Sequence, residues 1–270
     1  MRLDPSRTPQ STENVSVQAH WDPIADSFSN LPNRSPQHAA LCDLSPSHPV
    51  KEYGTNAFKV FLPTCSVEVG DVWALDSDGV VPFLHQFHPG ATTTLTNGEE
   101  GAFACLRAIS ADYAEIVFRI HSEITLASLA DFDGEWQGMR MQDDWMDAAR
   151  FILSQFAGRL VLNLKTRAIR TFSLALPPRN SNVDFNSFEE CDMLFVPRMQ
   201  LLAANENHLG EIAWDYSITT EEARKKLELS FYRFAEIDWL PIDEAIVQAE
   251  VAHHPIHAIL LWGALDDESC

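Results

Sequence analysis

The stretch YAEIVFRIHSEITL, residues 113–126, alternates between two kinds of side chain, and this alternation decides the fold class. On one side of an extended chain the residues are small or apolar: Ala114, Ile116, Phe118 and Ile120. On the other side they are mixed and partly charged: Tyr113, Glu115, Val117, Arg119 and His121. Alternation of period two, with β-branched and aromatic residues, predicts a β-strand whose two faces differ in polarity.

Further strands are predicted downstream of this one. The segments GRLVLNL (158–164) and AIRTFSLALP (168–177) are separated by Lys165-Thr166-Arg167 and predict a hairpin. The segment DMLFVPRMQLLA (192–203) predicts a strand at an edge or with a bulge, because Pro197 has no backbone N–H to donate.

One segment before the hairpin has a different period. In DDWMDAARFILSQF (143–156), helical spacing relates Trp145, Ala148, Ala149 and Ile152, so a helix is predicted there. Residues 55–210 are therefore expected to form an α+β domain that is rich in antiparallel strands.

The two ends of the chain differ from this middle part in composition and in residue pattern. Residues 1–54 are rich in Ser, Pro, Asn and His and are expected to form a mobile polar arm. Residues 211–270 predict a helix capped by Thr219 and Glu222, and then a second helix that begins at Pro241. The apolar run IHAILLW (256–262) follows and predicts a strand buried on both faces.

Composition narrows the possible partners. The chain has 270 residues, with 19 Lys and Arg against 39 Asp and Glu, which gives a net charge of −20. Such a charge repels phosphate backbones, so neither nucleic acid nor an anionic membrane surface is an expected partner.

No apolar run reaches the roughly 18–20 residues that span a bilayer. The polar opening MRLDPSRTPQSTENV shows no leader. A cytoplasmic location is therefore expected, or the endoplasmic reticulum membrane if the true start lies upstream in a eukaryotic source.

Neither the histidines nor the acidic residues predict a metal site. His85 and His88 have H-x-x-H spacing and three histidines cluster at 253–257, but neither group has a matching Glu or Cys partner. Packing and capping roles are expected for them. In Asp76-Ser77-Asp78-Gly79, the flanking positions that calcium would need are not carboxylates, so a surface turn is expected. No metal or cofactor is predicted.

Two other sets of side chains are candidates for chemistry. Arg119 and His121 lie on the polar side of their strand beside Glu115 and Glu123, where they could line a substrate groove or form a cross-strand ion pair, the commoner arrangement. The five cysteines are scattered and contain no CxxC pair, which argues against a disulfide scaffold: Cys42, Cys65, Cys105, Cys191 and Cys270. Cys105 is expected to be a small buried hydrophobe, whereas Cys42 and Cys65 could be resolving thiols.

The string HAILLWGALDDESC, residues 257–270, resembles the segment that leads into the redox motif of the selenoprotein N family. That motif runs Ser-Cys-selenocysteine-Gly, and Ser269-Cys270 matches its first two letters. Upstream blocks resemble the family in the same order: ACLRAIS (104–110), FRIH (118–121), NVDF (182–185), VPRMQL (196–201) and LPIDEA (240–245). The resemblance extends from about residue 60 to residue 270.

The resemblance implies a thiol–disulfide oxidoreductase. Residues 211–270 would be the first part of a thioredoxin-like redox domain, and Cys270 would be the resolving thiol beside Ser269. Its partner would be a selenocysteine just beyond Cys270, at a UGA codon read as a stop, so this chain is expected to be truncated and inactive by itself. The implied substrate is a protein disulfide or a small thiol, and the incomplete domain would favour self-association. The alternative is a non-catalytic module that binds or regulates a protein partner.

Overall fold

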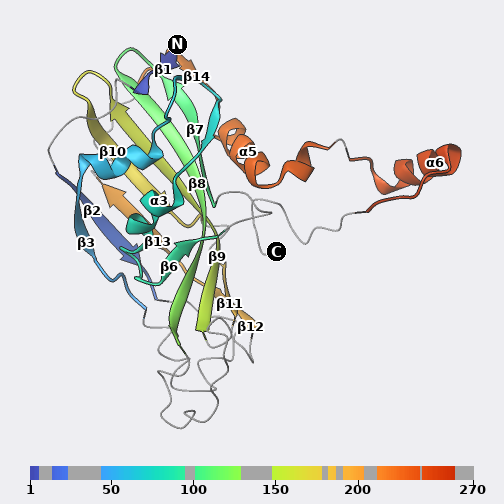
Figure 1. The fold of residues 1–270 in the computed structure, drawn as a ribbon, viewed down its shortest axis with the longest axis horizontal. Helices are drawn as coiled ribbons and strands as arrows, with labels where there is room; N and C mark the ends of the chain where they lie inside the picture. The colour runs from blue at the N-terminus through green and yellow to red at the C-terminus, as the bar shows by residue number, and fades with distance from the viewer. Residues whose placement is uncertain are drawn as a thin grey trace, which may run out of the picture.

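The computed structural model describes residues 1–5, 14–23, 44–94, 101–128, 148–177, 182–186, 191–203, 212–237 and 239–258. Within them, antiparallel strands form one large curved sheet of 12 strands (Figure 1). Short helices lie beside the sheet, except for the last helix, which lies away from it. Its main path runs in the order β14-β7-β8-β9-β10-β13-β2-β3. Off this path, β11 pairs with β9 and β12, β5 with β7, and β6 with β8, while β1 and β4 form a separate pair. The expected antiparallel, strand-rich architecture is confirmed.

The strands are β1 Arg2–Leu3, β2 Asn14–Trp21, β3 Val50–Gly54, β4 Val67–Glu68, β5 Val72–Ala74, β6 Ala91–Thr93, β7 Ala102–Ile109, β8 Tyr113–Ser128, β9 Ala148–Asn163, β10 Ala168–Ala175, β11 Asn182–Asn186, β12 Cys191–Phe195, β13 Met199–Ala203 and β14 Tyr216–Ser217. The α-helices are α3 Ser77–Leu84, α5 Thr220–Phe231 and α6 Ile242–Ala252. Two 3₁₀ helices, η2 and η5, span Thr55–Phe61 and Arg233–Glu236.

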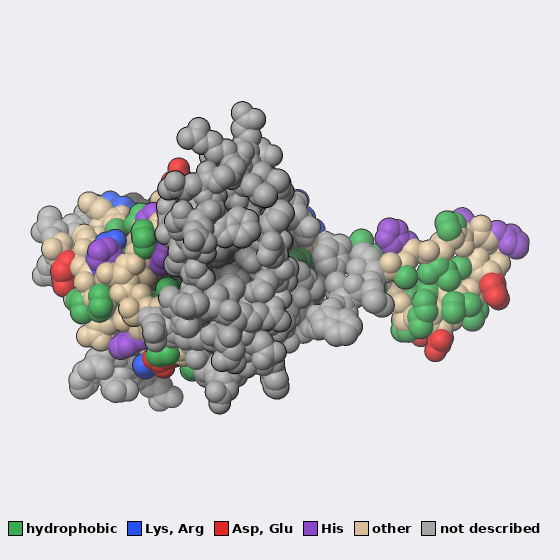
Figure 2. All heavy atoms as spheres, turned by 90° about the horizontal axis from the view of Figure 1, so that it is seen from below, with side chains coloured by type: hydrophobic (Ala, Val, Ile, Leu, Met, Phe, Trp, Pro, Cys, Tyr) green, Lys and Arg blue, Asp and Glu red, His purple; other side chains and the backbone are tan. Residues whose placement is uncertain are grey.

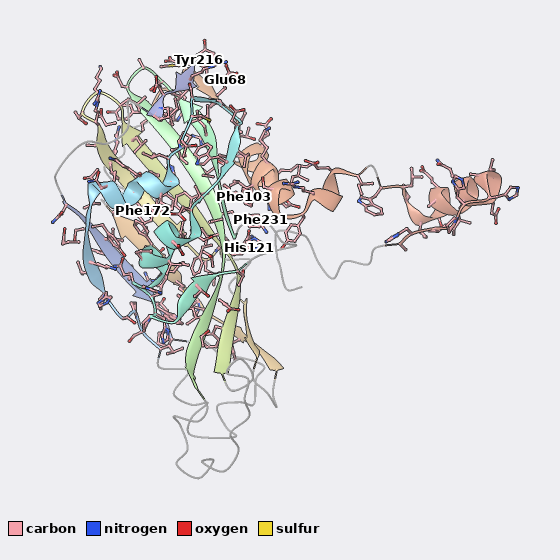
Figure 3. The ribbon with its side chains drawn as sticks, in the orientation of Figure 1. Glu68, Phe103, His121, Phe172, Tyr216 and Phe231 are labelled. Atoms are coloured by element: carbon pink, nitrogen blue, oxygen red, sulfur yellow. The ribbon has the colours of Figure 1, made fainter. Side chains whose placement is uncertain are left out.

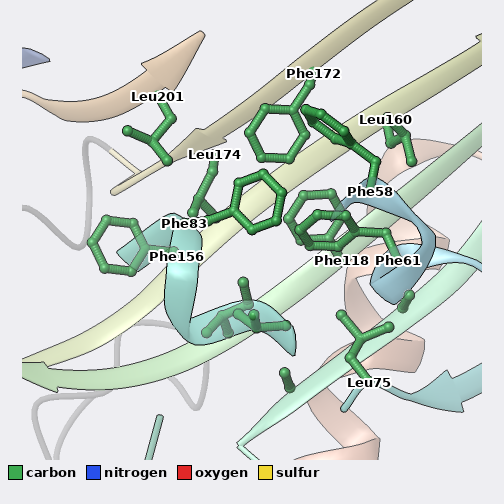
Figure 4. Packing of buried hydrophobic residues seen from close by; sticks show 14 of the residues in the cluster. Phe58, Phe61, Leu75, Phe83, Phe118, Phe156, Leu160, Phe172, Leu174 and Leu201 are labelled. Carbon is green, nitrogen blue, oxygen red and sulfur yellow. The ribbon is translucent and has the colours of Figure 1, made fainter. Parts of the chain in front are cut away.

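The predicted strand at 113–126 is the centre of the fold as β8. Its apolar side faces the main core, where Ile116, Phe118 and Ile120 are fully buried. Side chains from η2 and α3 complete this core, so the short helices fill the concavity of the sheet (Figure 4). The rings of Phe61 and Phe118 stack with their centroids 4.4 Å apart, and Phe58 meets Phe172 edge-on at 5.1 Å.

The polar side of β8 is buried too, which the alternation alone did not indicate. Glu115, Arg119 and His121 are each only 3% exposed. Helix α5 packs against β7 on this second face, through a small cluster that includes Phe103, Leu227 and Phe231. The sheet therefore has an aromatic core on one face, and a second, partly polar layer lies beneath α5 on the other.

The hairpin predicted at 158–177 is confirmed as β9 and β10, in which Asn163 pairs with Ala168. The segment at 192–203 differs from its prediction, because it forms two strands, β12 and β13, separated at Val196–Arg198. Pro197 lies between them, where the lack of an N–H costs the sheet no hydrogen bond.

The helix predicted at 143–156 is wrong over its described part. Residues from Ala148 onward belong to β9, and residues 143–147 lie outside the described residues. The cause is a bulge: Ile120 pairs with Phe156 and Ser122 with Leu153, so β9 carries one extra residue there. Because of this extra residue, the buried residues Phe151 and Phe156 lie five positions apart. Residues on one face of a regular strand lie an even number of positions apart, so this spacing conceals the alternation that predicts a strand.

The described stretches of the first 54 residues also depart from the prediction of a mobile arm. Asn14–Trp21 and Val50–Gly54 pair with each other as β2 and β3, and β2 pairs with β13. Val17, Ala19 and Trp21 are buried. Buried Gln86, which follows α3, connects β2 to the end of this helix. Its Nε2 donates a hydrogen bond to the carbonyl oxygen of Val17 at 2.8 Å.

The C-terminal helices form where the sequence predicts them, but the described first three residues of the strand predicted after them are not in a strand. Ile256–Ala258 have no strand conformation, and Ile256 is 44% exposed; residues 259–262 lie outside the described residues. None of the residues of α6 is buried. Its exposed apolar residues are Ile242, Ile246, Val247 and Val251, and Figure 2 shows hydrophobic side chains gathered on this helix.

The capping box predicted for the first of these helices is present in α5. The Thr219 hydroxyl accepts a hydrogen bond from the Glu222 N–H at 3.1 Å, and the Glu222 carboxylate accepts one from the Thr219 N–H at 2.7 Å. We expect Thr219→Ala to lower the free energy of unfolding by about 1 kcal/mol, since it leaves an N-terminal N–H without its partner. Urea denaturation measures this. Thr219→Ser, which keeps the oxygen, is the control, and equal losses in both variants would contradict the explanation.

Candidate functional site

The residues predicted to carry the chemistry, Ser269 and Cys270, lie outside the described residues, as does Cys42. Cys105 is buried, as expected, and burial raises the pKa of its thiol to about 11. A thiol with so high a pKa is almost entirely protonated at neutral pH and is a poor nucleophile. Cys65 is exposed and free.

The described residues contain an open pocket of about 550 Å³ between the sheet and α5. Strands β8, β9 and β10 contribute Arg119, Gln155, Gly158 and Ser173, and Thr220 and Leu227 come from α5. Four arginines line it, Arg107, Arg119, Arg159 and Arg224, and Glu115 is the one acidic residue among the lining residues. The pocket therefore gathers positive charge within an acidic chain.

Glu115 organises two of these arginines. Arg107 makes a bidentate pair with its carboxylate, with Nε–Oε1 and Nη2–Oε2 distances both of 2.6 Å. Arg159 of β9 adds an Nη2–Oε2 hydrogen bond at 3.2 Å. Burial tends to raise the pKa of Glu115, but the hydrogen bonds and charges of these two arginines outweigh it, so the pKa is lowered. The carboxylate is thus held ionised in the wall of the pocket.

A bulge in β7 makes the Arg107–Glu115 contact possible. Leu106 pairs with Ile116 and Ala108 with Glu115, which leaves Arg107 as an extra residue in β7. Its remaining guanidinium nitrogen donates to the carbonyl oxygen of Ile218 at 3.2 Å, in the segment that leads into α5. Arg107 therefore connects the sheet to the wall of the pocket.

Arg119 and His121 form the second polar contact of this layer. The Arg119 Nε donates a hydrogen bond to the His121 Nε2 at 2.9 Å. The His121 ring stacks on Phe231 of α5, with centroids 3.7 Å apart and planes 5° apart (Figure 3). Burial, and then the charge of Arg119, lowers the pKa of His121 to about 2. His121 is therefore neutral, and its unprotonated Nε2 positions the buried guanidinium.

The pocket partly matches the expectation for this face of the strand. Arg119 lines the pocket, as the groove hypothesis required, and His121 supports it from beneath. The ion pairs of Glu115 are with Arg107 and Arg159, and not with the two residues for which the sequence predicted a cross-strand pair. Sequence reasoning missed Arg107, Arg159 and Arg224. The alternation in the predicted strands marked Arg159 as a polar position, but no signal showed which strands would bring these arginines together.

Two of the other histidines, His88 and His253, have local roles. The Nδ1 of His88 accepts a hydrogen bond from the Gly90 N–H at 3.0 Å, and His253 ends α6 with a φ of 54°. Asp76 precedes the first turn of α3. Across the described ranges there is no group of three or more His, Cys, Asp or Glu side chains that could hold a metal ion. Nor does any helix in this part of the chain have the length and apolarity to cross a membrane.

Comparison with curated proteins finds selenoprotein N from three vertebrates. The Homo sapiens protein is 29% identical over 280 residues, which cover 82% of this chain and 45% of that protein. The Danio rerio protein is 30% identical over 272 residues, 79% of this chain and 46% of that protein. The Mus musculus protein is 29% identical over 280 residues, with 82% and 48% covered. The chain thus spans about half the length of the curated relatives it matches. No family model and no solved structure matches it.

Proposed function

The chain belongs to the selenoprotein N-like family, and from this we propose that it is a thiol–disulfide oxidoreductase. The proposed redox pair is Cys270 and a selenocysteine encoded by the next codon. The observation that carries the proposal is the ordered similarity over about four fifths of the chain, together with the string HAILLWGALDDESC that ends in Ser269-Cys270. Residues 211–270 would then be the first part of a thioredoxin-like domain.

The proposed reaction reduces a disulfide in a protein or a small molecule. The selenolate attacks one sulfur of the substrate disulfide; a selenium–sulfur bond forms, and the other sulfur leaves as a thiolate and takes a proton. The Cys270 thiolate then attacks the selenium, which releases the second substrate thiol and leaves Cys270 joined to selenocysteine. The substrate has gained two electrons. An external dithiol then reduces the bond between Cys270 and selenocysteine and is itself oxidised to a disulfide.

The residues beside the motif give a physical reason for selenium. Asp266, Asp267 and Glu268 precede the pair, and like charges so close raise the pKa of a thiol. A selenol is intrinsically more acidic than a thiol, so it stays ionised beside these carboxylates where a thiol does not. Selenium thus supplies the nucleophile in an acidic segment.

Two measurements test the proposal. The first is the genomic codon after Cys270, which we expect to be UGA and to be followed by a Gly codon; UAA or UAG would contradict the selenocysteine. The second is turnover of insulin or glutathione disulfide by the protein extended through that codon. We expect Cys270→Ser to reduce turnover at least about 100-fold, because the selenocysteine cannot complete the reaction without the second member of the redox pair.

The matched control is Cys65→Ser, which replaces an exposed cysteine outside the motif and should leave turnover unchanged. If the extended selenocysteine form reduces neither substrate, the oxidoreductase proposal fails, and a non-catalytic binding module becomes the better explanation. If Cys65→Ser removes activity and Cys270→Ser does not, the assignment of the resolving thiol is wrong.

A further inference from the structure

We infer that the pocket between α5 and strands β7–β10 binds a small polyanion, an organic molecule with at least two carboxylate or phosphate groups. The first argument is charge. Four guanidinium groups and a single carboxylate line the pocket, and Glu221, which pairs with Arg224, lies outside the lining. The site therefore keeps an excess of positive charge even with Glu221 counted, whereas the chain as a whole has a net charge of −20. Positive charge so concentrated in an acidic protein is a local feature of this pocket, and it attracts anions against the field of the rest of the molecule.

The second argument is the type of cation. All four basic residues of the lining are arginines. A guanidinium is planar, stays charged at any physiological pH and presents paired N–H groups, which match the two oxygens of a carboxylate or phosphate. The bidentate Arg107–Glu115 pair already shows this geometry inside the pocket. A ligand with oxyanion groups can repeat it on the arginines nearer the opening.

The third argument is accessibility. Arg159 of β9 and Arg224 of α5 come from different walls, and their side chains are 37% and 30% exposed. Arg159 is fixed by Glu115 and Arg224 by Glu221, so both are held in position before a ligand arrives. Such preorganisation lowers the entropic cost of binding. Buried Arg119, held by His121, adds positive charge at the floor.

The size and lining of the pocket indicate the size of the ligand. A volume of about 550 Å³ lies within the roughly 300–1,000 Å³ of small-molecule sites, which is more than a single inorganic ion needs. Val117, Ala157, Pro177 and Leu227 add apolar surface for a carbon skeleton. No lining residue belongs to the segment around Cys270, so this inference does not depend on the proposed redox function.

Calorimetric titration of the 270-residue chain with citrate and with pyrophosphate, in about 50 mM salt, tests the inference. Citrate carries carboxylates and pyrophosphate carries phosphates, so the two probes distinguish the possible sources of the oxyanion. We expect one equivalent of at least one probe to bind, and higher salt to weaken the binding. If neither probe binds at concentrations up to about 10 mM, the inference is wrong.

Variants locate the binding. Arg159→Gln is expected to weaken it at least about tenfold, as is Ala157→Leu, which fills the pocket without changing its charge. The control is Arg170→Gln: Arg170 stacks on Tyr113 and does not line the pocket, so the affinity should change less than about twofold. Circular dichroism and urea denaturation confirm that each variant is folded. Equal weakening in Arg159→Gln and Arg170→Gln would mean non-specific attraction and would overturn the assignment.

Discussion

Replacing Gly158 with alanine is expected to lower the free energy of unfolding by about 3 kcal/mol or more, at the upper end of the cost of overpacking a core. Gly158 of β9 pairs directly with Phe118 of β8, and the phenylalanine ring lies over the glycine. A Cβ atom at position 158 would lie 1.9 Å from Cε2 of Phe118 and 2.1 Å from its Cζ. Neither atom can move freely, because the ring is also stacked on Phe61 inside the core.

The measurement is urea denaturation of the variant beside a matched control. Gly54→Ala makes the same substitution at the end of β3, where a Cβ meets nothing within 4 Å and φ is −60°, so stability should be unchanged or slightly higher. Phe118→Leu in the Gly158→Ala background removes the clashing ring atoms and should recover part of the loss. Equal effects of Gly158→Ala and Gly54→Ala would show that the close contact carries no cost.

Acidification is expected to destabilise the protein through His121 well before the carboxylates titrate. The folded-state pKa of His121 is about 2, because of burial and then the charge of Arg119, against about 6.5 in the unfolded chain. Between these values the unfolded state binds the extra proton and the folded state does not. Stability therefore falls as the pH falls below about 6.5, by about 1.4 kcal/mol per pH unit and by about 3 kcal/mol at pH 4.

His121→Gln is the variant that isolates this effect. Glutamine offers an amide oxygen to the Arg119 Nε and does not titrate, so its stability should depend less on pH between about 6.5 and 4.5. Glu115 acts in a different window: its pKa is lowered in the fold, so its contribution is lost only below about 4.5. Urea denaturation of both proteins at several pH values measures the difference. Parallel curves above pH 4.5 would contradict the role given to His121.

Local patterns predicted the parts of the fold that local geometry controls. The alternation in 113–126 predicted β8, the apolar runs around Lys165 predicted the β9–β10 hairpin, and Thr219 with Glu222 predicted the start of α5. Each of these features depends on residues within a few positions of one another. The order of strands in the sheet depends on contacts far apart in sequence, and no local pattern indicates it.

The failures have the same physical origin. Strand β2 contains the alternating buried residues Val17, Ala19 and Trp21, but the polar composition around it predicted an arm, and its partner β13 is about 180 residues away. At the pocket, the sequence indicated that Arg119 has a polar environment. It could not indicate that a bulge brings Arg107 to Glu115, or that α5 supplies Arg224.

The alternation along β8 also limits how this protein can vary in evolution. Phe118 and Arg119 are consecutive, yet the Phe118 ring packs in the aromatic core, whereas the Arg119 guanidinium lies over the ring of Phe231 in the layer beneath α5. Inserting or deleting one residue upstream in this strand would exchange the two faces and place a guanidinium among the phenylalanines. Length changes in homologues should therefore occur in loops. The ligand preference of the pocket can therefore change by substitution of its lining residues, but not by a change in the length of β8. The residues of the core are subject to the same restriction on strand length.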